Sequence, residues 1–214
     1  MTCPLCHEDV AFFFEDERRP YHQCGQCELI FVPAEHLPTR EEEKAQYDLH
    51  ENSPEDTGYR RFLGRLTDPL LKKLSPGSVG LDFGCGPGPT LSVMLEEAGH
   101  QVALFDPIYH PDPKALERQY DFITATEVFE HLHNPKRNLE QLWNTLRTGG
   151  WLGVMTKRAQ NLEAFSRWHY IRDPTHVCFW TENTFRWLAG NWGAQLELIE
   201  PDVTLFRKHA ETAC

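Results

Sequence analysis

The chain has 214 residues and carries 32 Asp and Glu against 21 Lys and Arg, which gives a formal net charge of −11 with neutral histidine. Because binding to phosphates depends on Lys and Arg, this balance disfavours a broad nucleic-acid surface, although local basic pairs such as Arg60-Arg61 and Lys157-Arg158 remain. No apolar run approaches the roughly 20 residues of a membrane span, and the start lacks the basic and apolar regions of a signal peptide. We therefore expect a cytoplasmic protein with no membrane partner, consisting of one domain and a small appendage.

Two pairs of cysteines lie near the start of the chain, and each pair has two residues between its members. Paired thiolates at this spacing converge on one tetrahedral ion, and the distance between the pairs falls in the range of zinc ribbons. The alternatives are disulfides, which a reducing compartment disfavours, and a redox pair, which needs only one such motif. We expect residues 1–37 to form a small β zinc ribbon with a structural metal, because four thiolates leave no open coordination site. The predicted ligands are Cys3, Cys6, Cys24 and Cys27.

Residues 38–74 connect this ribbon to the rest of the chain. Residues 38–53 are polar and highly charged, which indicates a linker or an exposed helix. From residue 54 onwards apolar residues recur at helical spacing, which predicts helices that pack on a sheet. We expect a linker and cap helices here, followed by a main domain over residues 75–214.

The main domain opens with a short apolar strand that ends in Asp82 and leads into a glycine-rich turn over residues 84–88. Apolar residues at helical spacing follow, so the order is strand, turn, helix. Glycines let the backbone approach a ligand closely, and the free N–H groups at a helix start can hold an anionic group, which indicates a nucleotide-like cofactor. The fingerprint of dinucleotide-binding proteins requires a third glycine at the position of Pro89. The sequence therefore disfavours a dinucleotide such as NAD as the cofactor.

An acid followed by Gly-x-Gly-x-Gly resembles motif I of the class I S-adenosylmethionine (SAM) methyltransferases. Three later segments are also similar to that family: a strand at 101–106 that ends in an acid, a strand at 120–126, and a Gly-Gly turn into a strand at 148–155. The resemblance extends over residues 54–208 and is closest to the ubiquinone-methylase-like small-molecule methyltransferases. It implies an α/β fold, a Rossmann-like SAM methyltransferase sheet with helices on both faces.

The resemblance also assigns the cofactor site. Asp106 ends the second strand and is suited to the ribose diol, because a carboxylate can accept both hydroxyl hydrogens. The predicted SAM-binding residues are Asp82, Gly84, Cys85, Gly86, Gly88, Asp106 and Thr126. Only a short stretch separates Asp106 from Asp121, where the family usually has another strand and helix. We expect a loop with a very short strand there, and the adenine pocket is left unassigned.

The segment after the strand at 120–126 is Glu127-Val128-Phe129-Glu130-His131. If it forms a helical turn, two carboxylates and one imidazole share a face, which is half of a divalent-metal site. The same E-x-x-E-H string occurs in metal-dependent small-RNA 2′-O-methyltransferases, where a later histidine completes the site; here His169 or His176 is available. The predicted catalytic residues, and the ligands of a possible second metal, are Glu127, Glu130, His131 and His176. Without a metal, His131 or His176 serves as general base or as a packing group.

The resemblance points to two segments that cover the substrate, one before the first strand of the main domain and one before its closing hairpin. The tentative substrate residues are Tyr47, His50, Tyr59, Arg60, Trp168, His169 and Tyr170.

The sequence as a whole predicts a SAM-dependent methyltransferase that acts on a small metabolite at a hydroxyl, nitrogen or carbon. Similar ribbons precede methyltransferase domains in some sugar C-methyltransferases and in some ribosomal-RNA guanine methyltransferases, so an RNA methyltransferase that grips its substrate with the ribbon is the alternative. A further alternative is a protein that is not an enzyme, namely a zinc-ribbon interaction module whose SAM fold is catalytically silent.

Overall fold

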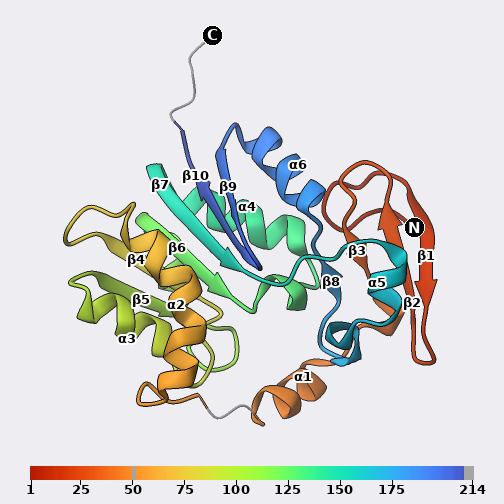
Figure 1. Ribbon diagram of the computed structural model, residues 1–214, viewed down its shortest axis with the longest axis horizontal. Coiled ribbons are helices and arrows are strands. Elements are labelled where there is room, and N and C mark those ends of the chain that lie inside the picture. Colours follow the sequence, from red (N-terminus) through yellow and green to blue (C-terminus); the bar gives the residue numbers. More distant parts are fainter. Residues whose placement is uncertain (50–51, 210–214) are drawn as a thin grey trace.

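Two β-sheets organise the part of the chain that the computed structural model describes, residues 1–49 and 52–209. The larger sheet has six strands in the order β5-β4-β6-β7-β10-β9, and the smaller has four in the order β1-β2-β3-β8. Figure 1 shows the smaller sheet beside the larger one, with the N-terminus among the ribbon strands. None of the described helices is long and apolar enough to cross a lipid bilayer.

Four neighbouring strands of the larger sheet are parallel. They are β4 (Val79–Phe83), β5 (Gln101–Phe105), β6 (Tyr120–Thr126) and β7 (Leu146–Met155). The sheet ends in the predicted antiparallel hairpin of β9 (Gln195–Ile199) and β10 (Val203–Arg207). Because β5 and β6 lie on opposite sides of β4, the strand order reverses at β4, and ligands of such sheets bind at the carboxyl ends of the strands there.

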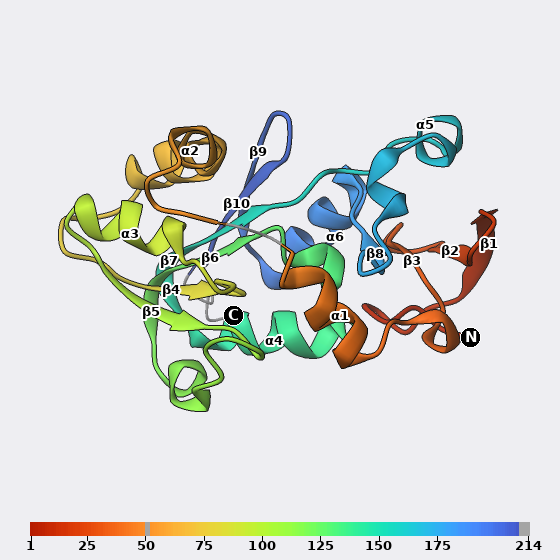
Figure 2. The same ribbon diagram turned by 90° about the horizontal axis from the view of Figure 1, so that it is seen from below.

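Helices cover both faces of the larger sheet, as the fold prediction requires. In Figure 2, α2 (Thr57–Leu71) and α3 (Thr90–Glu97) lie on one side of the sheet and α4 (Pro135–Thr145) lies on the other. The next helices are α5 (Leu162–Ser166) and α6 (Glu182–Trp192). Thr181 is the N-cap of α6, since its hydroxyl accepts a hydrogen bond from the amide of Thr184 at 3.0 Å.

The stretch between Asp106 and Asp121 differs from the expected loop with a short strand. A single β-bridge joins Asp106 to His110, and the 3-10 helix η2 (Pro113–Glu117) follows. Three prolines in this stretch remove backbone donors that a ladder would need, so a turn of helix forms where a strand was expected.

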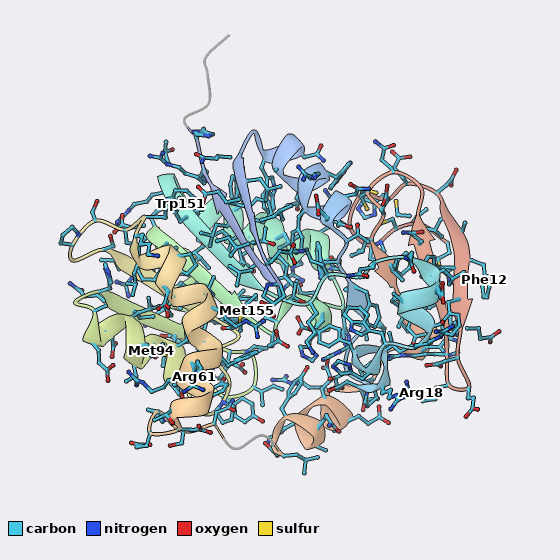
Figure 3. The ribbon with its side chains drawn as sticks, viewed as in Figure 1. Phe12, Arg18, Arg61, Met94, Trp151 and Met155 are labelled. Atoms are coloured by element: carbon cyan, nitrogen blue, oxygen red, sulfur yellow. The ribbon has the colours of Figure 1, made fainter. Side chains whose placement is uncertain are left out.

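The ribbon contributes three strands to the smaller sheet, and the main domain contributes the fourth. The strands β1 (Val10–Glu15), β2 (Pro20–Cys24) and β3 (Ile30–Phe31) are antiparallel neighbours, and β8 (Cys178–Phe179) pairs with β3. Side chains of the ribbon and of the main domain share one buried apolar cluster. Figure 3 shows Phe12 pointing outwards from β1, where its side chain is exposed. The ribbon is therefore fused to the main domain through both a sheet and a core.

A short helix lies between the two sheets. Helix α1 (Arg40–Tyr47) follows the 3-10 helix η1 (Ala34–His36), and both views place it in the gap between the larger sheet and the ribbon (Figures 1 and 2). Thr39 begins α1 with a capping box, in which its hydroxyl accepts from the amide of Glu42 and the Glu42 carboxylate accepts from the amide of Thr39. The predicted cap segment is thus helical on both sides of residues 50–51.

Candidate active site and cysteine cluster

A cavity of about 900 Å³ lies at the carboxyl ends of β4, β5 and β6, where the strand order reverses. Helices α1 and α2 supply its other walls. Most of the predicted cofactor, catalytic and substrate residues line it: Tyr47, Tyr59, Asp82, Gly84, Cys85, Gly86, Gly88, Asp106, Thr126, Glu127, His131 and His176. Residues that are far apart in the sequence therefore meet in one space.

The glycine turn is held against the end of β5. The amide of Gly86 donates to Asp106 Oδ2 at 3.1 Å, and the amides of Ile108 and Tyr109 donate to Asp106 Oδ1 at 2.8 and 3.0 Å. Gly84 has a φ of +72°, and a Cβ there would lie 2.5 Å from a methyl group of Val128. The turn therefore requires glycine for its conformation and for its close approach to β6.

Asp82 is a buried acid beside this turn. Its side chain is 2% exposed, and Oδ1 accepts a hydrogen bond from the Thr124 hydroxyl at 2.9 Å. Burial, with a smaller contribution from the nearby negative Asp106, raises the pKa of Asp82 to about 7. A positively charged ligand in the cavity would favour its ionised form.

The helical turn that was predicted over residues 127–131 is wrong in its first part. Glu127 adopts a left-handed conformation with a φ of +51°, and only η3 (Phe129–His131) is helical, as a single 3-10 turn. The left-handed residue redirects the chain at the end of β6, where the amide of Glu127 donates to the carbonyl of Met155 at 2.8 Å. Glu127 nevertheless lines the cavity, and Glu130 is fully buried behind the cavity wall, where it is not one of the lining residues.

Each of these two carboxylates has a buried oxygen without a hydrogen-bond partner among the described residues. Glu130 is fully buried; Tyr170 donates its hydroxyl to Oε1, and Oε2 is unpartnered. Oε1 of Glu127 is likewise unpartnered. Burial raises the pKa of Glu127 to about 8, helped by the negative Glu130, and burial also raises the pKa of Glu130. Unpaired buried carboxylates are costly, which indicates that a cation or a donor belongs beside them.

Two histidines direct their free ring nitrogens towards the same place. His131 Nδ1 lies 3.0 Å from the Thr175 carbonyl oxygen, and His176 Nδ1 lies 2.8 Å from the Tyr170 carbonyl oxygen. Since a carbonyl only accepts, Nδ1 carries the proton in each ring and Nε2 keeps its lone pair. Burial lowers the pKa of both imidazoles, that of His176 to about 3, so both are neutral.

The ligand atoms of Glu130, His131 and His176 all lie within 4.8 Å of one another. Two imidazoles and a carboxylate form a donor set that first-row divalent ions bind, and a second ring nitrogen that donates to a carbonyl is the usual support of a metal-binding histidine. Asp173 adds a further oxygen, with Oδ2 3.7 Å from His176 Nε2. The residues present therefore fit a divalent ion.

The remaining predicted residues lie outside the cavity wall. His169 is exposed and contacts Lys157 at 2.9 Å, while Arg60 is paired with Glu97 on the outside of α2. Trp168 stacks on Tyr170 with ring centroids 4.8 Å apart, and both belong to the aromatic cluster under the site. His50 lies outside the described residues. Of the two histidines that could complete the acidic cluster, the structure brings His176 to it.

Helix α1 adds wall residues that the sequence did not single out. Glu43 on this helix pairs with His133 at 3.0 Å, and Arg40 donates to the carbonyl of Pro107 at 2.7 Å. These contacts join positions remote in the chain, and no local pattern marks them. Asp173 was also missed, although its position three residues before His176 was a usable signal.

The cavity wall is acidic and aromatic. Its charged groups, apart from histidines, are Arg40 and the acids Glu43, Asp82, Asp106, Glu127 and Asp173. Its aromatic side chains are Tyr47, Tyr59, Phe62, Phe83, Phe105 and Tyr109. Such a wall repels anions and offers apolar surface and ring faces to a neutral or cationic ligand.

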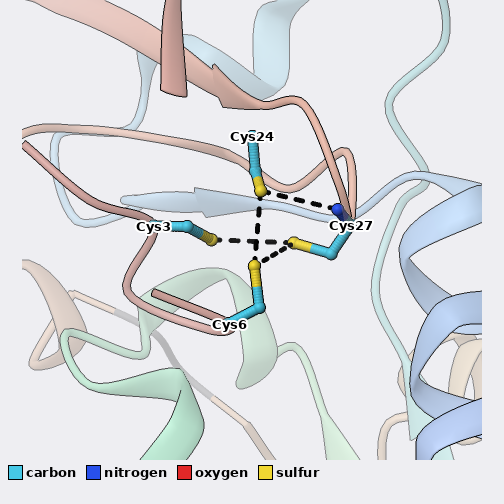
Figure 4. A group of neighbouring side chains, drawn as sticks. All are labelled: Cys3, Cys6, Cys24 and Cys27. Atoms are coloured by element: carbon cyan, nitrogen blue, oxygen red, sulfur yellow. Dashed lines mark hydrogen bonds between the residues drawn. The ribbon is translucent and has the colours of Figure 1, made fainter. Parts of the chain in front are cut away.

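The four predicted ribbon cysteines converge at the other end of the molecule. Figure 4 shows their sulfurs facing one another, with 3.6 Å between those of Cys3 and Cys27 and 3.3 Å between those of Cys6 and Cys24. All four are free thiols, and all four sulfurs lie within 4.8 Å of one another. The amides of Leu5 and Gln26 point at sulfurs of the cluster. Such a set of thiols fits a tetrahedral ion and not a pair of disulfides.

Comparison with known proteins identifies the family. The family model described as "Methyltransferase domain" matches residues 56–200. The chain is 25% identical over 177 residues to the tRNA 5-carboxymethoxyuridine methyltransferase of Escherichia coli O157:H7. This match covers 60% of the present chain and 67% of the relative.

Two solved structures share the fold at low identity. The magnesium protoporphyrin IX methyltransferase of Synechocystis PCC 6803 is 14% identical with a TM-score of 0.53, covering 77% of this chain and 91% of its own. The 1,6-didemethyltoxoflavin-N1-methyltransferase of Burkholderia thailandensis is 16% identical with a TM-score of 0.52. This match covers 94% of the present chain and 100% of that enzyme's chain. Together with the glycine turn and the sheet order, these matches show that the chain belongs to the methyltransferase domain family and is a class I SAM-dependent methyltransferase.

Proposed function

We propose that this enzyme transfers the methyl group of SAM to a small metabolite bound in the cavity at the ends of β4, β5 and β6. The observation that carries this proposal is that the ligand atoms of Glu130, His131 and His176 lie within 4.8 Å of one another, while both histidines line the same cavity as the glycine turn. Methyl transfer from a sulfonium depends chiefly on alignment, and one cavity that holds both reactants supplies it.

The cofactor would lie along the turn between β4 and α3. Asp106 directly follows β5 and lines the cavity, and its carboxylate would accept the hydrogen bonds of the ribose hydroxyls. Asp82, Gly84, Cys85, Gly86 and Gly88 form the wall for the rest of the cofactor, and Thr126 ends β6 beside the expected place of the sulfonium. The acids of this wall would also stabilise the positive charge of the sulfonium.

A neutral or cationic metabolite fits the cavity better than RNA does. The wall is acidic and aromatic, and Arg40 is the basic side chain that could meet a phosphate there. RNA is the second candidate, because the relative from Escherichia coli O157:H7 is a tRNA methyltransferase. The unpartnered polar cluster argues against a silent module, since buried carboxylates without partners are a cost that a functional site explains.

Glu130, His131 and His176, with Glu127 beside them, are the residues that would hold a divalent ion. Such an ion would lower the pKa of a bound hydroxyl and make its oxygen more nucleophilic. The chain itself fixes the donors: Tyr170 orients Glu130 through its hydroxyl and His176 through its carbonyl, and Thr175 orients His131. In the ribbon, Cys3, Cys6, Cys24 and Cys27 would hold one structural zinc.

The test is methyl transfer from labelled SAM into a cell extract that is afterwards separated into metabolite and RNA fractions. We expect label in the metabolite fraction with the wild-type enzyme and none with Glu130→Gln, while His169→Ala, an exposed change outside the cavity, behaves as wild type. Label in RNA would favour the second candidate. No label in either fraction from a protein that binds SAM would favour the silent module.

A further inference from the structure

The ribbon places one buried arginine against the loop that supplies His176. Arg19 lies in the turn between β1 and β2 and is 6% exposed. Its Nη1 donates to the carbonyl of Pro174 at 2.8 Å, and its Nη2 lies 3.1 Å from the carbonyl oxygen of Asp173 and 2.7 Å from that of His176. One side chain thus satisfies three backbone carbonyls within four residues of the loop that ends at His176.

Arg19 is itself held in place by the ribbon. Its Nε donates to the hydroxyl of Tyr21 at 3.1 Å, and that hydroxyl donates to Asp16 Oδ2 at 3.0 Å. The neighbouring Arg18 donates to the carbonyls of Ile171 and Arg172. Figure 3 labels Arg18 at the foot of the ribbon hairpin, beside the segment that follows α5. The hairpin turn therefore presents two guanidinium groups to one loop.

The other end of this loop is joined to the ribbon by backbone hydrogen bonds. The amide of Val32, just after β3, donates to the carbonyl of Val177 at 2.9 Å, and the amide of Val177 donates to the carbonyl of Glu130 at 2.7 Å. The pairing of β3 with β8 continues this contact. His176 is thus held between Arg19 on one side and β3 on the other.

The loop has little regular structure of its own. Residues 173–176 belong to no helix or strand. Their carbonyls therefore lack the backbone partners that regular secondary structure provides, and the guanidinium of Arg19 donates hydrogen bonds to three of them. Buried carbonyls without partners are costly, and the loop would rearrange to recover them if the arginine were removed. Since the ring of His176 is oriented by the Tyr170 carbonyl in the same segment, such a rearrangement would displace its Nε2.

We propose that Arg19 is a positioning residue of the methyltransferase site, because it holds the loop that carries His176. The ribbon then supports the structure of this site and is not a separate RNA-binding module. The inference rests on the proposed function, in which His176 belongs to the catalytic cluster. Each nitrogen of the Arg19 side chain already has an acceptor within the protein, so this group is not offered to a phosphate.

The test follows the ring of His176 directly. In the full, zinc-loaded chain with ring-¹⁵N histidine, NMR should show the His176 of the wild type as a single neutral tautomer with its proton on Nδ1. In Arg19→Gln we expect a mixture of tautomers at His176, with one zinc per ribbon and SAM affinity within about twofold of wild type, because neither site contacts Arg19. Arg167→Gln is the matched control, since this arginine, which follows α5, is exposed and pairs with the exposed Glu163; it should leave His176 unchanged.

An unchanged His176 signal in Arg19→Gln would overturn the inference. If that variant loses zinc or SAM binding, Arg19→Lys decides in its place: the lysine keeps the charge but lacks the fork that spans separate carbonyls, so an intermediate signal supports the inference and a wild-type signal overturns it.

A second readout separates this inference from the proposed metal site. Titration with Co²⁺ should show binding to the wild type beyond the ribbon, weakened about tenfold to a hundredfold in Arg19→Gln, as for other residues that orient metal ligands. If the wild type binds no Co²⁺ beyond the ribbon, the proposed ion is wrong, while the tautomer measurement still decides the role of Arg19.

Discussion

The rings of His131 and His176 meet edge to face, with centroids 4.8 Å apart and planes at 70°, and each uses Nδ1 to donate to a backbone carbonyl. One ligand atom of each ring and one of Glu130 lie within 4.8 Å of one another, and Glu130 Oε2 has no hydrogen-bond partner among the described residues. This relationship is the structural basis for a site that binds a cation, or for one that accepts a proton.

The paired histidines lead to a prediction for metal binding. Zinc-loaded wild-type protein should bind one additional Co²⁺ ion, and His176→Ala should weaken that binding by more than the tenfold to hundredfold that supporting residues cost, because it removes a ligand. SAM affinity should stay near wild type, since the ion orders the acceptor and not the cofactor. Calorimetric and absorption titrations measure both, with His169→Ala as the control. Equal Co²⁺ affinity in the His176 and His169 variants would exclude the site.

The cysteine cluster predicts a tightly held zinc. Metal analysis should find about one zinc per chain that persists through gel filtration and is lost in Cys24→Ser, because the four thiolates stabilise a ribbon too small for a core of its own. Ser78→Ala, a change in the main domain, should keep its zinc. A metal-free protein with two disulfides would contradict this reading.

Asp106 should contribute to SAM affinity. Asp106→Ala should weaken SAM binding by about 1.5–3 kcal/mol, the range for hydrogen bonds to a charged group, because it removes a ribose acceptor and also the acceptor of the Gly86 amide. Asp112→Ala, at an exposed acid of the same loop, is the matched control. Calorimetric titration in which both variants match the wild type would remove Asp106 from the site.

Asp82 predicts a pH dependence of stability in the cofactor-free protein. Its pKa is raised from an ordinary value near 3.8 to about 7 in the folded state, mainly by burial. The folded state therefore holds the proton more tightly, and the stability linked to this group, present below pH 4, is lost as the pH rises through 7.

The measurement compares thermal unfolding of the wild type and Asp82→Asn from pH 4 to pH 8. The melting temperature of the wild type should fall relative to that of the variant across this range, because the amide has no charge to desolvate and can still accept from Thr124. A difference that is constant with pH would mean that Asp82 is ionised at low cost.

Local patterns allowed much of the fold to be predicted. The cysteine pairs and the glycine turn after β4 each depend on residues within a few positions of one another, and the structure brings the four cysteines together and forms the turn. The Rossmann-like sheet with helices on both faces followed from the family resemblance. These features are specified by short segments and need no knowledge of distant contacts.

Long-range contacts limited the remaining predictions. The pairing of β8 with β3 joins two-residue strands from opposite ends of the chain, and such short strands leave no periodic pattern. Tyr170 was expected at the substrate and instead lies beneath the catalytic cluster, because its hydroxyl satisfies the buried Glu130. The left-handed Glu127 was also missed, since nothing in its neighbourhood of the sequence marks a positive φ at a glutamate.

The most direct test of this account is methyl transfer to the metabolite fraction by an enzyme stripped of every metal except the ribbon zinc. We predict that turnover is lost while SAM still binds, and that added Mg²⁺, Mn²⁺, Fe²⁺ or Co²⁺ restores it in the wild type but not in His176→Ala, because mixed nitrogen and oxygen sites hold divalent ions less tightly than four thiolates do. Full turnover after exhaustive metal removal would contradict the account and leave Glu130, His131 and His176 as an acid–base or packing cluster.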